Sequence, residues 1–268
     1  MPISTTGRDD RAAVDKAISL LAELGGLGGA AAGVSELARR TDMSKSTAYR
    51  LLEVLVRNGV VERSGSGYRL GGRLHELGRS VYAPGHDQLR DLLIPELTEL
   101  FQATGETVHL AVLHGSDVVY LAKLYGRRQV RSPSRIGGRA PAHCTAVGKA
   151  LLAYDLGDVA GQFDGPLRRF TPHTHGDSRS LQTELSRVSQ EGVAFDRQEI
   201  QLGLECVAMP VADARGRAVA ALSVSGAAGH IDLGRHARTL RRVAHTASAT
   251  LTRHMRRAGR LSDAGGAA

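Results

Sequence analysis

Short amphipathic segments separated by polar turns make up the N-terminal part of the chain. Apolar residues recur at helical spacing over 10–24, 36–41 and 45–57, which predicts three helices. Ser35 and Ser44 stand directly before the second and third segments, and serine is a favoured residue at the start of a helix. The chain is therefore expected to begin with a small bundle of three helices.

Two β-prone runs, 60–63 and 68–70, flank a Ser/Gly-rich turn and predict a hairpin after the third helix. This order is typical of a winged helix-turn-helix, which we place at 10–71. The third helix has an apolar rear and a hydroxylic, basic first turn, as suits entry into the DNA major groove. A three-helix bundle that does not bind DNA has the same periodicity and is the alternative. The residues predicted to contact DNA are Ser35, Ser44, Lys45, Ser46, Thr47, Tyr49, Arg50, Arg63 and Arg69.

Residues 72–86 form another amphipathic segment, with Leu74, Leu77 and Val81 on one stripe. The segment predicts a linker helix between the N-terminal head and a larger body. Its apolar stripe suits pairing with a second copy of the chain and equally suits packing on the head, and the pattern does not choose between the two.

Residues 87–257 mix helical and strand-like patterns without a regular strand–helix–strand rhythm, which predicts an α+β domain. The polar, Gly/Ala-rich end at 258–268 is predicted to be disordered. The expected elements of the body are a helix over 87–104, strands at 108–113 and 118–121, a helix from 145, a helix over 181–191, strands at 193–196, 206–211 and 218–225, and a final helix over 232–257.

Composition narrows the possible classes of function. Trp is absent and aromatic residues make up 4 % of the chain, so a stacking platform for single-stranded nucleic acid is not expected. No apolar run approaches the ~20 residues of a membrane helix, and the start lacks a signal-peptide pattern. We therefore expect a cytoplasmic protein that does not associate with membranes. Cys144 and Cys206 are too few for a disulfide scaffold or a cysteine zinc site.

The net charge of +8 favours a polyanionic partner. Positive charge is concentrated within 43–73, where basic side chains outnumber Glu53 and Glu62. Double-stranded operator DNA is the expected partner of the head.

Three motifs, in this order, resemble the isocitrate lyase regulator (IclR) family of bacterial transcription regulators. Residues 34–39 and 44–52 are similar to its second and third helices, and 142–150 is similar to the start of its effector-pocket helix. The family signature Gly-x3-Asp-x2-Glu-x6-Cys is matched at every spacing by Gly192, Asp196, Glu199 and Cys206. The resemblance covers about residues 10–255.

The resemblance implies a winged head, a linker helix and a GAF-like α+β effector-binding body. It also implies a homodimer or homotetramer whose grip on an operator changes when a small organic metabolite binds the body. We expect a repressor of a catabolic operon. Carried over by motif, the effector site contains Thr145, Ala146, Val147, Asp196, Cys206, Ser223 and Ser225, with Ile136 and Ala140 as apolar wall positions.

The start of the helix at Thr145 favours an acidic effector, because the N–H groups of Ala146, Val147 and Gly148 are predicted to face outward and to cradle an anion. Asp196 in the same pocket would repel an anion placed beside it. A hydroxylated acid satisfies both features, with its carboxylate at the helix start and its hydroxyl near Asp196. An aromatic acid is also among the effectors that the resemblance implies.

Two other functions remain as alternatives. An enzyme would use the head as a tether and Asp196, Cys206 or His143 as chemical groups, but their spacing assigns no nucleophile and base. A ligand-free architectural protein would have no cavity in the body. No cofactor or metal is predicted, because the histidines lack zinc-site spacing and the glycine run at 25–29 lacks Gly-Lys-Ser/Thr.

Overall fold

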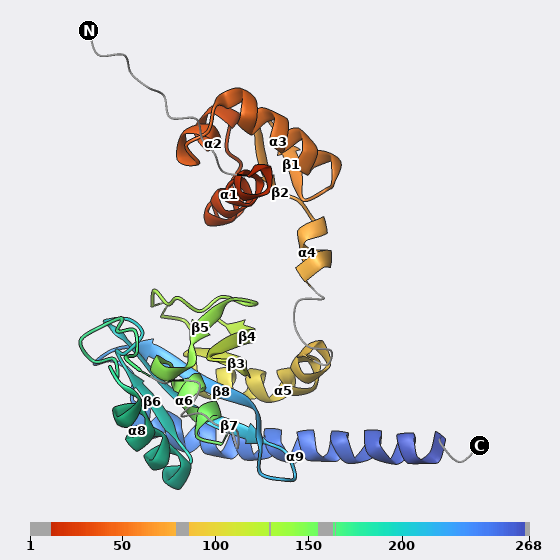
Figure 1. Ribbon diagram of the computed structural model, residues 1–268. Helices are drawn as coiled ribbons and strands as arrows, with labels where there is room; N and C mark the ends of the chain where they lie inside the picture. Colours follow the sequence, from red (N-terminus) through yellow and green to blue (C-terminus); the bar gives the residue numbers. More distant parts are fainter. Residues whose placement is uncertain (1–11, 79–85, 129, 155–162, 164, 266–268) are drawn as a thin grey trace. The chain divides into compact units, whose positions relative to one another are not determined.

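The computed structural model describes residues 12–78, 86–128, 130–154, 163 and 165–265, with side chains as far as residue 257. The chain divides into two compact units, 1–84 and 85–268. We call them the head and the body (Figure 1).

The head contains the three helices and the hairpin that the sequence predicts. Leucines from all three helices, among them Leu20, Leu37 and Leu52, are fully buried and form one core with Tyr68 of the hairpin. Its elements are α1 (Ala13–Gly26), α2 (Val34–Arg40), α3 (Lys45–Arg57), the antiparallel strands β1 (Val61–Ser64) and β2 (Gly67–Leu70), and α4 (Arg73–Gly78).

Two boundaries in the head differ from the prediction. Helix α2 starts two residues earlier than expected: Gly33 is its N-cap, and Ser35 lies inside the helix with an exposed side chain, so the expected cap at Ser35 is wrong. The apolar spacing alone did not show that the backbone already turns at Gly33. Helix α4 ends at Gly78, while Val81 and the end of the predicted linker lie outside the described residues.

The described body is built on a six-stranded antiparallel sheet in the order β5-β4-β3-β8-β7-β6. Helices α5 and α9 cover one face of this sheet, and α6 and α8 lie on the other (Figure 1). The α+β prediction is confirmed. The elements are α5 (His86–Thr104), β3 (Thr107–His114), β4 (Asp117–Leu124), β5 (Arg139–Pro141), the 3₁₀ turn η1 (Ala142–Cys144), α6 (Ala146–Leu152), α8 (Ser178–Glu191), β6 (Ala194–Arg197), β7 (Leu204–Ala212), β8 (Ala218–Ala227) and α9 (Leu233–Gly265).

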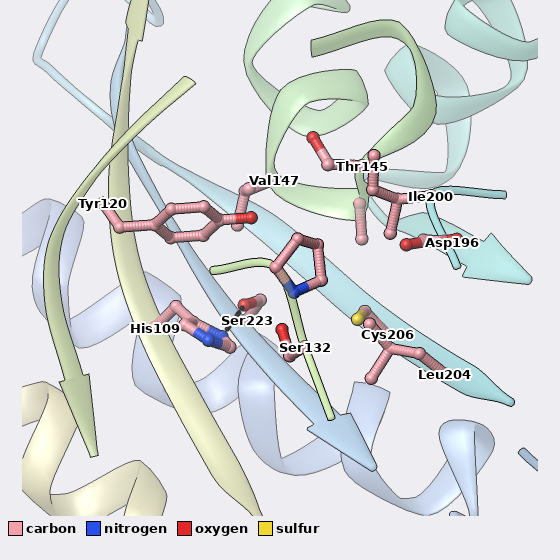
Figure 2. Close-up of a pocket in the computed structure, with 12 residues that line it drawn as sticks. His109, Tyr120, Ser132, Thr145, Val147, Asp196, Ile200, Leu204, Cys206 and Ser223 are labelled. Atoms are coloured by element: carbon pink, nitrogen blue, oxygen red, sulfur yellow. Dashed lines mark hydrogen bonds between the residues drawn. The ribbon is translucent and has the colours of Figure 1, made fainter. Parts of the chain in front are cut away.

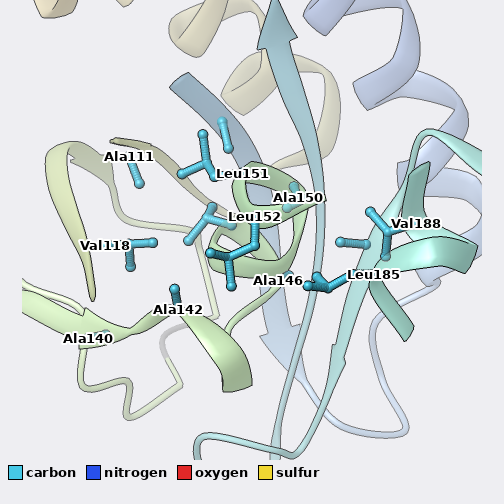
Figure 3. Packing of buried hydrophobic residues seen from close by; sticks show 14 of the residues in the cluster. Ala111, Val118, Ala140, Ala142, Ala146, Ala150, Leu151, Leu152, Leu185 and Val188 are labelled. Carbon is cyan, nitrogen blue, oxygen red and sulfur yellow. The ribbon is translucent and has the colours of Figure 1, made fainter. Parts of the chain in front are cut away.

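Strand periodicity separates the two faces of the sheet. On β3, Val108 and Leu110 are buried on one side, whereas Ala111 belongs to the cluster under α6 and α8. Figure 3 shows that this cluster is built largely from small side chains, with Ala146 and Ala150 of α6 facing the sheet. Because these side chains are short, α6 approaches the sheet closely, and its first turn comes next to the strands that carry polar residues.

Helix α9 is longer than the sequence predicts. We expected it to end near residue 257 and the tail to be disordered from 258, but the helix continues to Gly265. The prediction relied on the loss of apolar residues to bury. A helix that is already nucleated adds one backbone hydrogen bond for each further residue and needs no new apolar contact to do so.

Candidate functional site

The first turn of α3 presents hydroxyl and basic groups on the outside of the head. Lys45, Ser46, Tyr49 and Arg50 are exposed, and among the described residues neither Lys45 nor Arg50 has an ion-pair partner. Ser44 caps the helix as predicted, with its hydroxyl oxygen 3.2 Å from the Thr47 amide nitrogen that donates to it. The Ser44 hydroxyl also lies 2.8 Å from Thr47 Oγ1, so both hydroxyls serve first to shape the turn.

The two hairpin arginines are already paired. Arg63 Nη2 lies 2.5 Å from Glu53 Oε1, and Arg69 Nε lies 2.7 Å from Glu62 Oε1. The hydrogen bonds that Arg63 donates to Tyr49 and Glu53 raise the pKa of Arg63, which stays charged. A paired arginine gains less from a phosphate than an unpaired one, because it must give up its carboxylate partner. The unpaired cations of α3 are therefore the stronger candidates for DNA contact.

The body contains a small cavity between the sheet and the first turn of α6 (Figure 2). Strand register builds its floor: His109 of β3 is directly opposite Ser223 of β8, and Asp196 of β6 is directly opposite Cys206 of β7. The volume that the centres of water molecules could occupy inside the cavity is about 20 Å³. This is room for a ligand of only a few heavy atoms. The residues that line it are His109, Tyr120, Ser132, Pro133, Thr145, Ala146, Val147, Asp196, Ile200, Leu204, Cys206 and Ser223.

The cavity brings together six of the residues that were predicted for the effector site, namely Thr145, Ala146, Val147, Asp196, Cys206 and Ser223. Three others do not line it. Ile136 is 63 % exposed on its loop, and Ala140 is buried in the core cluster beneath α6. Ser225 lies one strand repeat beyond Ser223, and its hydroxyl donates to the Thr107 carbonyl oxygen over 3.3 Å. Position along a loop or strand did not reveal which way these side chains point.

The helix start is capped as predicted, but it is less open than expected. Thr145 Oγ1 accepts a hydrogen bond from the Gly148 amide over 3.2 Å and donates one to the Pro141 carbonyl. The expectation that the Gly148 N–H is free is therefore wrong, because the capping side chain uses it. Ala146 and Val147 remain as the N–H groups of this turn that line the cavity.

Several lining groups were missed by the sequence analysis. Tyr120 is buried, its hydroxyl points into the cavity, and no described residue forms a hydrogen bond with that hydroxyl (Figure 2). His109 lies between Ser223 and Ser134, with its ring nitrogens 3.2 Å and 2.9 Å from the two hydroxyl oxygens. Polar residues at alternate positions of otherwise apolar strands were the available signal. No spacing rule identified Ser132 or Ile200.

Family models match both units of the chain. The model described as the IclR helix-turn-helix domain matches residues 13–65, and that of the bacterial transcriptional regulator IclR C-terminal matches residues 84–251. The chain belongs to the IclR family of bacterial transcriptional regulators. A helix-turn-helix is a DNA-binding motif, and the matched residues include α3 with its exposed first turn.

Curated relatives are named as regulators. The chain is 38 % identical over 199 residues to the HTH-type transcriptional regulator KdgR of Dickeya chrysanthemi, a match that covers 72 % of this chain and 64 % of that regulator. It thus spans less than two thirds of that relative's length. It is 35 % identical over 204 residues to the HTH-type transcriptional regulator XynR of Escherichia coli, covering 74 % of this chain and 80 % of that one.

Solved IclR structures have the same fold. The Thermotoga maritima IclR structure matches with a TM-score of 0.74 and 30 % identity, over 89 % of this chain and 98 % of that chain. An IclR homolog of Microbacterium hydrocarbonoxydans, solved in complex with 4-hydroxybenzoate, matches with a TM-score of 0.71 and 27 % identity, over 90 % of this chain and 99 % of that chain.

The four signature residues of this IclR chain do different things. Gly192 has a φ of 71° and ends α8 in the left-handed conformation, which favours glycine. Asp196 and Cys206 line the cavity. Glu199 does not line it; its Oε1 atom lies 2.5 Å from Nζ of Lys149, a lysine of α6 that is 1 % exposed.

Lys149 joins three segments of the body around α6. Its ammonium group also lies 3.2 Å from Glu184 of α8. Burial opposes ionisation of Glu184, but hydrogen bonds and charge from Arg187 and Lys149 outweigh it and lower the pKa of Glu184 to about 2. This buried network fixes α6, and with it the Thr145 turn, against α8 and the segment before β7.

Asp196 is less anionic than the sequence suggests. Burial, and then the nearby charge of Glu199, raise the pKa of Asp196 to about 7, although the Glu199 amide donates to its Oδ1 atom over 2.7 Å. Below that pH the Asp196 carboxyl is protonated and can donate a hydrogen bond. The expected repulsion of an anion by Asp196 is therefore weak in mildly acidic solution.

Asp196→Asn is expected to change the pH dependence of stability. A carboxyl whose pKa is raised by folding contributes stability at low pH and loses it as the pH rises through about 7. An asparagine cannot ionise and keeps an acceptor for the Glu199 amide. Relative to wild type, the free energy of unfolding of the variant should rise by up to about 1.4 kcal/mol for each pH unit between the usual carboxyl pKa of 3.8 and about 7. Urea unfolding at about pH 5 and about pH 8 measures the change.

Asp232→Asn is the matched control. Asp232 is exposed, and a hydrogen bond from the Arg235 amide lowers its pKa, so it is ionised in the folded and unfolded protein across the same window. Its effect should be the same at both pH values. A pH-independent effect of Asp196→Asn would contradict the raised pKa.

The described residues give no support for a metal site, a reactive thiol or a membrane span. No group of three or more His, Cys, Asp or Glu side chains there could hold a metal ion. Burial raises the pKa of both the Cys144 and the Cys206 thiols, so both stay protonated and unreactive. None of the described helices is long and apolar enough to span a membrane.

Proposed function

We propose that this chain represses a catabolic operon by binding its operator through α3 and releases it when a small organic acid enters the body cavity. The observation that carries the proposal is the pairing, in one chain, of an exposed first turn with unpaired cations and a cavity lined by converging polar groups.

In the DNA complex, Lys45, Ser46 and Arg50 contact bases and phosphates of the major groove, and Tyr49 lies beside them. Arg63 and Arg69 follow the neighbouring backbone once their glutamate partners are exchanged for phosphates. Ser35, Ser44 and Thr47 support this surface through the helix turns that they occupy.

The regulator acts as a homodimer or a homotetramer. Two apolar side chains one turn apart on α1, Val14 and Ile18, are 71 % and 59 % exposed, which supports a contact between heads. Two joined heads read two half-sites, and the effector alters their spacing because it binds one arrangement more tightly than the other.

The effector proposed for the cavity is a small organic acid. Hydroxyl groups of Tyr120, Ser132 and Ser223 and the carboxyl of Asp196 offer hydrogen bonds to it, while Val147 and Leu204 supply apolar wall. The related homolog bound to 4-hydroxybenzoate supports an organic acid as ligand. A molecule as large as an aromatic acid would require the cavity to open.

No catalytic role is proposed. The Cys206 thiol is protonated, and burial lowers the pKa of His109 to about 3, which makes its ring a weak base.

Operator binding is expected to weaken steeply with salt and to depend on Arg50. Each phosphate contact adds a slope of about −0.9 in log K against log salt. Arg50→Ala should cost about 1–3 kcal/mol of binding free energy while leaving the cavity unchanged. Fluorescence anisotropy with the DNA upstream of its own gene, measured between about 50 and about 200 mM salt, tests both statements.

Arg39→Ala is the matched control, because Arg39 is an exposed arginine of α2 outside the predicted contact set. It should bind the operator as wild type does. An affinity indifferent to salt, or an equal loss in both variants, would remove α3 as the DNA-reading element. Circular dichroism confirms that each variant is folded.

A further inference from the structure

Lys123 of β4 is a buried cation without a carboxylate partner among the described residues. Its ammonium group donates to the backbone oxygen and to the hydroxyl of Ser134, both over 2.9 Å, and lies 4.7 Å from the centre of the Tyr125 ring. These partners are neutral. Lys149, by contrast, has two glutamates.

Burying the charged ammonium group of Lys123 costs free energy. Removing an ammonium group from water disfavours it, and neutral hydrogen-bond acceptors return only part of the lost hydration. Consistent with this, burial lowers the pKa of Lys123. A cation kept under these conditions is expected to have an anionic partner at some stage of its function.

Hydrogen bonds lead from Lys123 directly to the cavity wall. Ser134 Oγ, which accepts a hydrogen bond from Lys123, lies 2.9 Å from Nε2 of His109 and 2.7 Å from Oγ of Ser132. His109 in turn lies 3.2 Å from the Ser223 hydroxyl. Ser132, His109 and Ser223 all line the cavity, so Lys123 stands one hydrogen-bonded residue behind that wall.

The strand wall around Ser132, His109 and Ser223 supplies no opposing charge, and the carboxyl that lines the cavity, Asp196, has a pKa raised to about 7. With its pKa lowered to about 3 by burial, His109 is neutral, and burial also raises the pKa of Tyr120, which keeps its hydroxyl protonated. The Tyr120 hydroxyl, which forms no hydrogen bond with any described residue, points into the same space (Figure 2). The strand wall therefore combines hydrogen-bond donors with the positive field of Lys123.

We propose that Lys123 is the countercharge of the effector and that the cavity selects a compact carboxylate whose charged end lies against Ser132, His109 and Ser223. The inference rests on the proposed effector function and specifies its ligand class. It puts the carboxylate at the strand wall, whereas the sequence analysis put it at the first turn of α6. The charge of Lys123 polarises Ser134 and, through its hydrogen bonds, His109 and Ser132, which strengthens their hydrogen bonds to a carboxylate. Lys123 thus acts as a specificity-determining residue without touching the ligand.

Matched acids and amides test the proposal. Glycolate is compared with glycolamide, and lactate with lactamide, by calorimetry on the full-length protein. In wild type, at least one acid should bind about tenfold or more tightly than its amide. In Lys123→Met the affinities of each pair should come within about twofold. Lys16→Met, a lysine substitution in the head, should keep the wild-type preference.

A second measurement separates a ligand role from a structural one. Because Lys123 has no anionic partner among the described residues, ligand-free Lys123→Met should melt at the same temperature as wild type or higher. A lower melting temperature would mean that the lysine stabilises the fold and would overturn the proposal. So would equal affinity of wild type for acid and amide, absence of binding by both acids, or an acid preference that survives in Lys123→Met.

Operator binding by the same preparations distinguishes the two levels of failure. If wild type binds its operator but does not prefer the acids, only the assignment of Lys123 and its ligand class fails. If wild type does not bind operator DNA, the proposed function fails.

Discussion

Lys149→Met is expected to lower the free energy of unfolding of the body by about 3–5 kcal/mol, the usual cost of removing one partner from a buried ion pair. Lys149 is 1 % exposed, and its loss leaves Glu199 buried, with an Oε2 atom that has no hydrogen bond from any described residue and lies 3.9 Å from Nε2 of His175. Glu184 is affected less, because Arg187 Nη2 remains 2.9 Å from it. Urea unfolding followed by circular dichroism should show a lower midpoint at an unchanged slope.

The double variant Lys149→Met, Glu199→Gln is the informative control. It removes both charges, so much of the lost stability should return, as it does when a buried pair is replaced by neutral groups. Arg187→Met, which touches the same Glu184 from the half-exposed side, should cost about 1 kcal/mol or less. If Lys149→Met were no more damaging than Arg187→Met, the network would not be what holds α6.

Gly148→Ala is the second substitution with a large expected effect. A Cβ atom at Gly148 would lie 2.2 Å from the backbone oxygen and 2.3 Å from the Cα atom of Ala142. Both are backbone atoms of the turn before α6, so the turn itself would have to move. The cost is about 3 kcal/mol, at the upper end for overpacking, and the cavity should lose its ligand because Thr145 and Ala146 move with the turn.

Gly234→Ala serves as the control, because Gly234 lies in the first turn of α9 and the nearest atom to an added Cβ is 3.5 Å away. It should be neutral or should stabilise by up to about 1 kcal/mol, since alanine favours helix. Thermal melts compare the two variants, and calorimetry with the acid that binds wild type reports on the cavity. A Gly148→Ala protein that melts and binds as wild type does would show that this close approach is not needed.

Features that depend on neighbours along the chain could be predicted. Ser44 and Thr145 cap their helices as expected, and Gly192 ends α8, because capping and left-handed termini involve residues only a few positions apart. The order of helices and hairpin in the head followed from the same local signals. The error in the head was local as well: α2 starts at Val34, so Ser35 is the second residue of the helix and not its N-cap.

The cavity depended on contacts that are distant in the sequence. His109 and Ser223 are 114 positions apart and meet only through the pairing of β3 with β8. Asp196 and Cys206, which the motif grouped in one site, both line the cavity because the cross-strand register of β6 and β7 keeps them opposite each other. Ile136 from the same motif comparison is exposed and does not line the cavity, since a loop residue has no strand register to aim its side chain.

The amino-acid order was sufficient for the class of the head, the α+β body and the family, because periodicity, capping and motif spacing are written within short stretches of chain. Tertiary structure alone decided which polar groups converge, which cations are paired, and how much room is left between them. Those outcomes depend on burial and on which charged and polar groups lie next to each ionisable side chain. Lys149 and Lys123 show it most clearly: both lysines are buried, but Lys149 is paired with two glutamates, whereas Lys123 donates to Ser134 behind the cavity wall.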